Sequence, residues 1–482
     1  MAAYAPIVFS SREDFQDAYK TVHATFRSNR TKDLAWRQWQ LKQVWWMLAD
    51  NEQRILEALK NDLNRHAFEA HTGDLYGLKS DILHTIANFR EWVKDEKPGS
   101  GLINYLGKAR LRKEPLGVSL IIGAWNFPFL LLLQPLLAAI ASGCAAILKP
   151  SELSVHSHNL LLELVPKYLD QSAIRIVAAG PTEMGYILDH RFDQIFYTGS
   201  PNVAKIVAKA AARFLTPTVL ELGGQGPAIV TRSGDIDLAA KRIAAAKFTN
   251  AGQICLSTNH AFVPMDLQPQ FVERLKYWFD KFSGPGQSWG DFCKIVNDRH
   301  FDRLATLVDR SAAKIQYGGA RDKKTGFMHP IIMTGVSLDD SIMSQELFGP
   351  ILPIITAEPE EAVQYIRSFE HPLAIYIFSN DKEEIDYILN NTQSGGVTIN
   401  DCFLHAGVDG APFGGVGEAG QGYYHGIYGV RAFSHLRTVV GLPNWMDKLI
   451  GFRYPPYNLA NLSKLGLPAN PPFKRVSTWA ET

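Results

Sequence analysis

Short apolar runs alternate with amphipathic segments over most of this chain. In the first series, which begins at Gly117, the runs are rich in Val and Ile and short enough to be buried strands. Its predicted strands cover residues 118–124, 145–149, 174–178, 194–197 and 218–221. A second series has predicted strands at 261–263, 354–357, 374–378 and 396–400, and a predicted helix at 268–282. This alternation predicts an α/β fold built on parallel, doubly wound sheets.

Residues 32–63 precede the first series and carry apolar side chains at helix spacing. The tryptophans of this region, among them Trp39 and Trp45, are predicted to lie in the core. His66, Glu69 and His71 come next, but their spacing matches neither the HExxH nor the HxxEH zinc motif. We therefore predict a solvated helix face there, and no metal site.

The stretch from residue 115 to 148 contains no charged residue and is long enough to span a bilayer. Pro128, Gln134 and Pro135 interrupt it, which favours a buried strand, a buried helix over 129–142 and a second buried strand. Pro128 would then lie in the first turn of the helix and Gly143 at its end. We accordingly predict no membrane span.

Composition narrows the class of protein. A chain of 482 residues predicts two or three structural units. Lys and Arg number 49 against 48 Asp and Glu, so the net charge of +1 argues against a nucleic-acid partner. Four cysteines without a CxxC pair, and an N-terminus without a signal peptide, favour a reducing compartment, here the cytoplasm.

Three segments lie outside the two series. Residues 97–113 and 432–440 have strand character and would pair with each other or with a partner subunit. Residues 445–452 are amphipathic, and would cap a substrate entrance or contact a membrane surface. Residues 454–482 lack apolar periodicity and predict an extended surface tail.

Cys255 is the strongest candidate for chemistry. It ends the sequence NAGQIC, a short distance after Glu221 in ELGG. A thiolate is a strong nucleophile, and a nearby carboxylate can activate water, so the pair suggests covalent acyl chemistry. Cys144, Cys293 and Cys402 lie in ordinary apolar or mixed sequence and are interpreted as small buried hydrophobes.

Further polar side chains follow the predicted strands. Gly199 and Ser200 follow a strand and open a helix, a turn that directs backbone N–H groups at an anion. Lys149 ends another strand, at the sheet edge where open α/β folds bind nucleotides. Asn126 follows the preceding strand and carries an amide suited to stabilising an oxyanion. Glu346 and Phe413 stand on glycine-bearing loops.

These motifs together resemble the NAD(P)-dependent aldehyde dehydrogenases over nearly the whole chain. The matching sequences are WNFP at 125–128, KPSE at 149–152, FYTGS at 196–200, ELGG at 221–224, NAGQIC at 250–255 and ELFGP at 346–350. PFGGVG at 412–417, the YHG at 424–426, FSHLR at 433–437 and RYPP at 453–456 resemble class 3 members, the fatty and aromatic aldehyde enzymes, of a fungal type.

The resemblance implies the aldehyde dehydrogenase fold, with a Rossmann-like cofactor domain, an α/β catalytic domain and a small bridging element. The implied boundaries are 1–96 with 114–222 for the cofactor domain, 223–430 for the catalytic domain, 97–113 with 431–443 for oligomerisation strands, and 444–482 for a C-terminal segment and tail.

The resemblance also assigns roles. Cys255 would be the nucleophile, Asn126 the oxyanion donor and Glu221 the general base for thioester hydrolysis. The implied cofactor-binding residues are Trp125, Lys149, Glu152, Gly199, Ser200, Glu346 and Phe413. The implied cofactor is NAD, with NADP as an alternative, because Glu152 would repel a 2′-phosphate. No metal is implied. The implied assembly is a homodimer without a transmembrane anchor, with peripheral membrane contact as an open alternative.

The chain departs from the family pattern at three positions near the cofactor. Gln225 stands where lysine is common, Ala204 where a second glycine is expected, and Pro201 where a small hydroxyl residue is usual. Two other functions stay open: a dehydrogenase that transfers the acyl group to coenzyme A, and a non-catalytic structural homologue. The substrate is an open choice among medium- or long-chain aliphatic, aromatic and apocarotenoid-like aldehydes.

Overall fold

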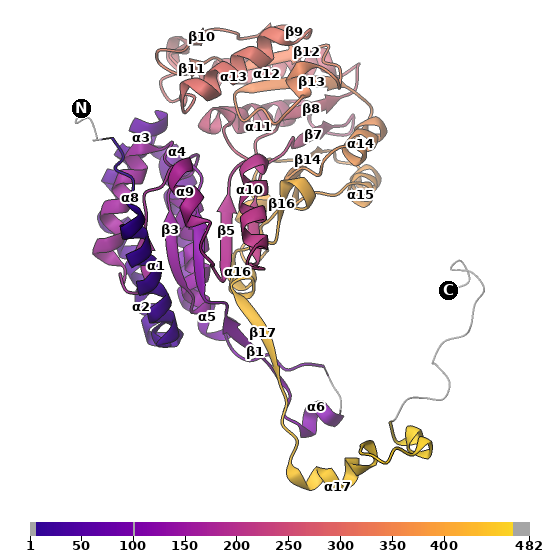
Figure 1. The fold of residues 1–482 in the computed structure, drawn as a ribbon. Helices are drawn as coiled ribbons and strands as arrows, with labels where there is room; N and C mark the ends of the chain where they lie inside the picture. Colours follow the sequence, from indigo (N-terminus) through magenta and orange to yellow (C-terminus); the bar gives the residue numbers. More distant parts are fainter. Residues whose placement is uncertain (1–5, 100–101, 466–482) are drawn as a thin grey trace. The chain divides into compact units, whose positions relative to one another are not determined.

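A computed structural model describes residues 6–99 and 102–465 of the chain. The chain divides into two compact units, one of Met1–Lys94 and Lys113–His435, the other of Asp95–Arg112 and Leu436–Thr482. The larger unit contains two main sheets with helices on their faces (Figure 1). The prediction of an α/β fold is confirmed.

The first sheet has six strands in the order β16-β6-β5-β2-β3-β4. All neighbouring strands are parallel except β16 and β6. The strands are β2 (Val118–Ile122), β3 (Ala145–Lys149), β4 (Ile174–Ile176), β5 (Gln194–Thr198), β6 (Thr218–Glu221) and β16 (Gly420–Gln421). The predicted strands agree within two residues at either end. β16 was not predicted, because two residues carry no periodicity.

Helices cover both faces of this sheet. Alternate residues of β3 point to opposite sides, so that Ala146 and Leu148 join one hydrophobic cluster while Ala145 and Ile147 join another. The first cluster is completed by α2 (Leu34–Asp50), α3 (Glu52–Leu63), α5 (Gly77–Trp92), α7 (Leu130–Ser142) and α8 (Val155–Tyr168). The second is completed by α1 (Arg12–Arg27), α9 (Pro181–Ile187) and α10 (Pro201–Ala212). The sheet is therefore doubly wound.

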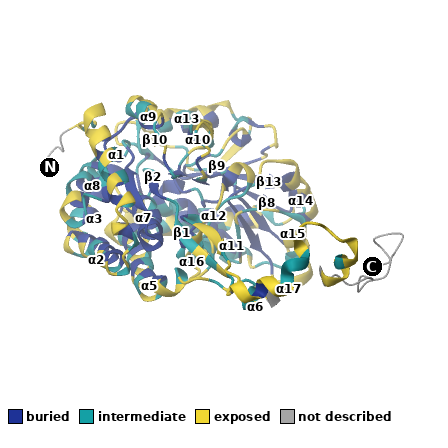
Figure 2. Cartoon of the chain, turned by 60° about the horizontal axis from the view of Figure 1, so that its bottom comes forward, coloured by how far each residue is buried: buried dark blue, intermediate teal, exposed yellow. Residues whose placement is uncertain are grey.

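The uncharged stretch forms a buried strand, helix and strand, as predicted. Helix α7 has 13 residues, and Gly143 ends it in the left-handed conformation with φ 95°. Eleven of its residues are buried against neighbouring elements, and Figure 2 shows this region in dark blue. No helix in the described part of the chain is long and apolar enough to cross a membrane.

The second sheet has seven strands in the order β15-β14-β7-β8-β13-β12-β9. Only β9 is antiparallel to its neighbour. The strands are β7 (Pro227–Val230), β8 (His260–Val263), β9 (Lys314–Tyr317), β12 (Ile331–Thr334), β13 (Ile351–Thr356), β14 (Ala374–Phe378) and β15 (Gly396–Ile399). The prediction identified β8, β14 and β15, and placed the start of β13 three residues late because Pro353 interrupts the apolar run.

Helices also pack on both faces of the second sheet. One cluster includes α11 (Ile236–Phe248) and α12 (Gln268–Phe282), and α12 has the predicted bounds. The other includes α13 (Asp298–Arg310), α14 (Pro359–Ser368) and α15 (Lys382–Asn391). The remaining elements of the larger unit are short: η1 (Arg30–Lys32), α4 (Ala67–Ala70), η2 (His71–Tyr76), η3 (Thr249–Gly252), η4 (Pro285–Gln287), β10 (Arg321–Asp322), β11 (Phe327–Met328), η5 (Ser341–Met343), η6 (Leu404–Gly407), η7 (Gly417–Ala419) and α16 (Gly426–Ala432).

The helical pattern predicted over 32–63 forms two helices, α2 and α3, which are separated at Asn51. Two other predictions for the N-terminal region need correction. Trp39 is 45% exposed and lies outside the core, whereas Trp45 packs partly against it. Glu69 does not lie on a solvated face, because its carboxylate binds buried groups. The described part of the chain contains no group of three or more His, Cys, Asp or Glu residues that could hold a metal ion.

The two outlying strand segments pair with each other. β1 (Arg110–Pro115) and β17 (Ser434–Val439) form a two-stranded sheet. The smaller unit further contains α6 (Leu102–Leu106), η8 (Asn444–Met446), α17 (Asp447–Ile450), η9 (Gly451–Arg453) and η10 (Leu459–Leu465). Within the amphipathic segment Met446 is buried, while Trp445 and Leu449 are exposed. The tail prediction falls mostly on residues 466–482, outside the described residues.

Candidate active site

Several predicted site residues meet at one edge of the first sheet. Because β2, β3, β5 and β6 are parallel, their carboxyl ends lie on the same side. Lys149 ends β3 and Glu221 ends β6, while Asn126 and Gly199 follow β2 and β5. The Gly199 N–H donates to the Glu221 carbonyl at 3.0 Å, which joins two of these strand ends. The topology thus groups residues that are far apart in sequence.

Cys255 stands on the loop between α11 and β8 of the second sheet. The loop passes through Asn250 and Ala251, both left-handed with φ near 50°, a conformation that residues other than glycine adopt only when the surroundings hold them. The thiol is half-buried. Burial, together with the Glu346 and Glu221 carboxylates, raises the pKa of Cys255 to about 12. The sulfur is therefore protonated at neutral pH and needs a proton acceptor before it can attack.

Glu221 has the properties of such an acceptor. The side chain is 3% exposed, and neither carboxylate oxygen has a hydrogen-bond partner among the described residues. Burial raises its pKa well above the usual value for a carboxyl. A carboxylate without fixed partners can bind a water or accept a proton, and a raised pKa makes it a stronger base.

Asn126 connects the first sheet to the cysteine loop. Its side-chain Nδ2 donates to the Gln253 carbonyl at 3.1 Å, two residues before Cys255. Asn126 is 3% exposed, so its amide lies in a site with little water. An amide nitrogen carries two hydrogens, and the second has no assigned acceptor among the described residues. That hydrogen is available to an oxygen of a bound substrate.

The turn after β5 has the shape of an anion site. A side chain at Gly199 would meet the Tyr197 hydroxyl, so the position favours glycine. The Ser200 hydroxyl caps the 12-residue helix α10, whose N-terminus attracts negative charge. Two of the residues that depart from the family pattern are compatible with this helix. Pro201 lies in its first turn, where proline is well tolerated, and Ala204 is buried.

Lys149 and Glu152 form an ion pair near the same edge. The Lys149 side chain is 7% exposed and the Glu152 side chain 27%. The pair keeps a carboxylate beside the lysine that was predicted to bind ribose hydroxyls.

Glu346 belongs to the same site, from the loop before β13. A side chain at Gly223 would meet both carboxylate oxygens of Glu346, so Glu346 lies directly against the ELGG turn. Burial raises the pKa of Glu346 to about 7, opposed by a bond from the Gly224 backbone and by Arg303 and Lys247. Gln225 donates to the Met343 carbonyl at 3.0 Å, where it joins the turn to the segment before Glu346.

Two aromatic residues complete the predicted set. Phe413 stacks between the imidazoles of His405 and His425, with ring centroids 6.5 and 5.4 Å away. Burial lowers the pKa of both histidines to about 4, so the stack is uncharged at neutral pH. Trp125 instead packs against His300 and Phe348, at 5.5 and 5.4 Å. Phe413 and Cys255 pack against the same hydrophobic cluster.

The family assignment rests on this geometry and on comparison with known proteins. The profile of the Aldehyde dehydrogenase family matches residues 3–439, which is most of the chain. The chain belongs to the aldehyde dehydrogenase family. It is accordingly an oxidoreductase that oxidises aldehydes with NAD or NADP.

Relatives of this aldehyde dehydrogenase come from several kingdoms. Aldehyde dehydrogenase family 3 member B1 of Rattus norvegicus is 38% identical, over 94% of this chain and 97% of its own. Beta-apo-4'-carotenal oxygenase of Neurospora crassa is 38% identical, over 99% of this chain and 90% of its own. An aldehyde dehydrogenase of the plant Craterostigma plantagineum is 40% identical, over 93% and 94%. The likeness to class 3 enzymes is confirmed, while the fungal type stays a prediction.

A solved structure of a related protein has the same fold. The Staphylococcus aureus AldH, described in a substrate-bound state, has a TM-score of 0.86 and 33% identity, and covers 91% of this chain and 98% of its own. The aldehyde dehydrogenase fold predicted from the motifs is therefore confirmed.

Sequence analysis missed several polar residues of this aldehyde dehydrogenase. Lys247 is fully buried, donates to the Gly349 carbonyl at 3.2 Å, and has a pKa lowered by burial to about 7. Arg65 and Asp74 are both 0% exposed and pair with each other. For Lys247 the available signal was a charged residue on the otherwise apolar face of α11. Such residues are buried only when paired or functional.

Proposed function

We propose that this enzyme oxidises an apolar aldehyde to its carboxylic acid through a thioester on Cys255. The supporting observation is the buried Glu221 carboxylate, neither oxygen of which has a hydrogen-bond partner among the described residues. A thiol, a base and an amide donor in one site are the groups that acyl chemistry needs.

The first half of the reaction builds the adduct. The Cys255 sulfur adds to the aldehyde carbon, and the thiol proton passes to Glu221. The carbonyl oxygen becomes an oxyanion, which the free N–H of Asn126 and the Cys255 backbone N–H stabilise. When the oxyanion re-forms its carbonyl, the carbon loses a hydride and becomes a thioester. A bound nicotinamide dinucleotide supplies the hydride acceptor.

The second half releases the acid. Glu221 first returns its proton to solvent and then takes one from a water molecule. The resulting hydroxide attacks the thioester carbon, the carbon–sulfur bond breaks, and Cys255 is regenerated. Because Glu221 is present and has no hydrogen-bond partner among the residues that the structure describes, hydrolysis is favoured over transfer to coenzyme A.

The residues at the sheet edge fit the dinucleotide. The Gly199 turn and Ser200 would receive the pyrophosphate at the start of α10, and Lys149 and Glu346 would bind ribose hydroxyls. Phe413 would pack near the nicotinamide ribose, and Trp125 would border it.

Glu152 is proposed to favour NAD over NADP. Its carboxylate pairs with Lys149, so a 2′-phosphate bound at that lysine would meet a negative charge. Replacing Glu152 with glutamine should raise the ratio of kcat/KM for NADP+ to that for NAD+ by about 10-fold, a typical gain from removing one close repulsion. Initial rates with both cofactors measure it. An unchanged ratio would contradict this role for Glu152.

The substrate class is proposed as medium- to long-chain aliphatic, aromatic or apocarotenoid-like aldehydes. Support comes from Phe127, Phe403 and Phe413, which pack against the same hydrophobic cluster as Cys255. The test is reduction of NAD+ and NADP+ with hexanal, longer alkanals, benzaldehyde and retinal, with and without coenzyme A. Product that is free acid supports hydrolysis, and product that is the coenzyme A thioester supports the acylating alternative. No reduction with any aldehyde would favour a non-catalytic homologue.

A homodimer is the proposed assembly. The paired strands β1 and β17 keep polar, largely exposed residues along much of their length, and the adjoining apolar residues Val440, Leu442 and Trp445 are exposed. Exposed apolar side chains in a cluster often mark an interface. Light scattering after size-exclusion chromatography should give the mass of two chains. The mass of one chain would contradict the proposal.

A further inference from the structure

Arg65 is a buried charged residue that the proposed reaction does not use. Its side chain is 0% exposed and lies between α3 and α4. Its Nη1 pairs with Asp74 Oδ2 at 2.7 Å, and its Nε lies 3.5 Å from Glu69 Oε1. Buried ion pairs add little net stability, because each charge loses its hydration. The position therefore calls for a reason other than stability.

The third Arg65 contact is to a proposed catalytic residue. Arg65 Nη2 donates to the main-chain carbonyl of Asn126 at 2.5 Å. The guanidinium also stacks on the ring of Phe127, with Cζ 4.6 Å from the ring centroid. Arg65 thus holds both the backbone of Asn126 and the residue that follows it.

Asp74, the ion-pair partner of Arg65, also binds the start of α7. Its Oδ1 accepts hydrogen bonds from the Phe129 and Leu130 N–H groups at 3.1 and 3.0 Å. The Arg65 and Asp74 pair therefore contacts the Asn126 segment on both sides: at the Asn126 carbonyl and at the first turn of the next helix.

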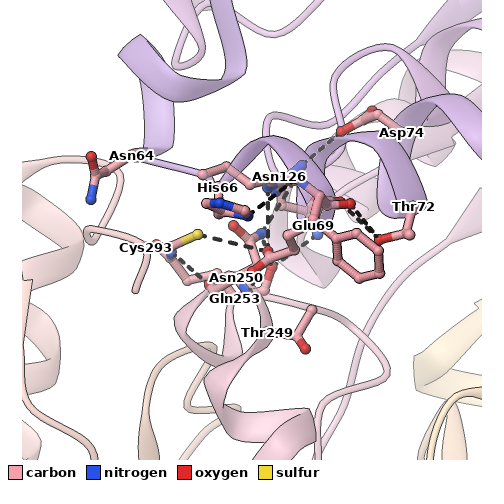
Figure 3. A network of polar contacts seen from close by, with 12 residues as sticks. Asn64, His66, Glu69, Thr72, Asp74, Asn126, Thr249, Asn250, Gln253 and Cys293 are labelled. Carbon is pink, nitrogen blue, oxygen red and sulfur yellow. Dashed lines mark hydrogen bonds and ion pairs between the residues drawn. The ribbon is translucent and has the colours of Figure 1, made fainter. Parts of the chain in front are cut away.

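Glu69, which also lies beside Arg65, binds the cysteine loop. Its Oε1 accepts the Asn250 N–H at 2.8 Å and the Cys293 thiol at 3.7 Å. Asn250 is in the left-handed conformation, so this carboxylate bond stabilises a backbone geometry that is otherwise unfavourable. Figure 3 shows Glu69 and Cys293 beside this loop.

Side-chain amides join the Asn126 segment to the cysteine loop. Asn250 Nδ2 donates to the carbonyls of Asn126 and Gln253 at 3.2 and 3.1 Å. The Gln253 carbonyl thus accepts both asparagine amides, and the Gln253 side chain binds Asn250, Lys294 and Val296 backbone groups. Figure 3 shows Asn126, Asn250 and Gln253 close together in this arrangement. The Arg65 network is defined by these residues: Arg65, Glu69, Asp74, Asn126, Asn250 and Gln253.

We propose that Arg65 is a positioning residue which, through this network, fixes the Asn126 amide relative to Cys255. One hydrogen of the Asn126 amide is bound to Gln253, and the other is directed at the substrate oxygen. The orientation of that second hydrogen depends on the Asn126 backbone, which Arg65 holds. This inference rests on the proposed function, because it concerns the oxyanion of the same reaction.

Three assays on the Arg65→Lys variant separate positioning from general damage. Aldehyde oxidation and p-nitrophenyl acetate hydrolysis both build an oxyanion on a carbon bound to Cys255. Alkylation of Cys255 by iodoacetamide uses the same thiol without building an oxyanion. Lysine retains a positive charge but cannot bind Asp74 and the Asn126 carbonyl with a planar fork.

The expected result is a selective loss. Arg65→Lys should lower kcat for oxidation and the rate of ester hydrolysis by about 10- to 100-fold, below the loss of about 10²- to 10³-fold typical of deleting an oxyanion donor. The alkylation rate and the KM for NAD+ should change less than about 2-fold, since neither depends on an oxyanion donor. Equal loss in all three assays, or loss in none, would overturn the proposal.

Arg37 provides the matched control. It is also buried, at 6% exposure, and its guanidinium binds the main-chain carbonyls of Thr31, Lys32 and Ala141, away from the site. Arg37→Lys should lower the Tm while both oxyanion-dependent rates stay near wild type. A selective loss of those rates in Arg37→Lys would show that any buried arginine has this effect, and would overturn the assignment to Arg65.

A second variant covers the case in which Arg65→Lys does not fold. Asp74→Asn retains the acceptor for Phe129 and Leu130 and removes only the charge that pairs with Arg65. It should show the same selective loss, and unchanged ester hydrolysis would overturn the proposal. If the wild type hydrolyses the ester but oxidises no aldehyde, the proposed function fails, while the ester and alkylation rates still decide the role of Arg65.

Discussion

Replacing Cys255 with alanine is expected to abolish aldehyde oxidation. The variant lacks the sulfur that carries the acyl group, so kcat/KM should fall by at least about 10³-fold, as when a catalytic nucleophile is removed. The raised pKa of the thiol, about 12, does not oppose this role, because Glu221 is the proposed acceptor of the thiol proton during attack. Reduction of NAD+ with the best aldehyde of the panel measures the effect.

Cys144 is the matched control for this variant. Its thiol is fully buried beside Ser142 and the Phe433 carbonyl, and burial raises its pKa. Cys144→Ala should keep kcat within about 2-fold of wild type, because only a small buried side chain changes. Oxidation by Cys255→Ala at the wild-type rate would show that the thiol is not the nucleophile.

Replacing Glu221 with glutamine is expected to stop the enzyme after one turnover. Glutamine has the same shape but cannot accept a proton from water, so thioester hydrolysis should slow by about 10²- to 10⁴-fold, the usual contribution of a general base. The thiol proton also loses its proposed acceptor, so the first turnover should be slower than in the wild type. The measurement is the time course of NAD+ reduction at high enzyme concentration.

The raised pKa of Glu221 predicts how kcat changes with pH. Burial raises the pKa of Glu221, so its basic form appears only as the pH rises through that raised value. Wild-type kcat should therefore increase with pH along an acidic limb that the Glu221→Gln variant lacks. Glu273→Gln, an exposed carboxylate paired with Lys276, serves as the control and should leave the profile unchanged. An identical acidic limb in wild type and Glu221→Gln would assign the titration to another group.

The elements that sequence predicted best are those whose own residues determine them. Buried parallel strands are short runs of aliphatic and aromatic residues, so β3, β5 and β6 could be identified directly. The common location of Lys149 and Glu221 at one sheet edge followed, because the carboxyl ends of parallel strands share an edge. Their roles stay predictions. Trp39 was misplaced because α2 is apolar on more than one side, so spacing alone does not say which face packs.

The part that sequence could not predict depends on long-range contacts. Arg65 binds the carbonyl of a residue 61 positions away, and Glu69 binds a backbone N–H 181 positions away. No local periodicity encodes such pairs. Glu69 was therefore assigned to a solvated face, although its neighbours in space make it part of a buried network. The roles of Asn250 and Gln253 went unassigned for the same reason, although both lie inside the NAGQIC motif.

The most direct test of the central claim is the mass of the Glu221→Gln protein after incubation with an aldehyde and NAD+. If the acyl group is carried on Cys255, the protein should gain the mass of the aldehyde less two hydrogens, and peptide mapping should place this gain on Cys255. Omitting NAD+ should prevent the gain, because no oxidation then occurs. Reduction of NAD+ without any adduct on Cys255 would contradict a thioester mechanism.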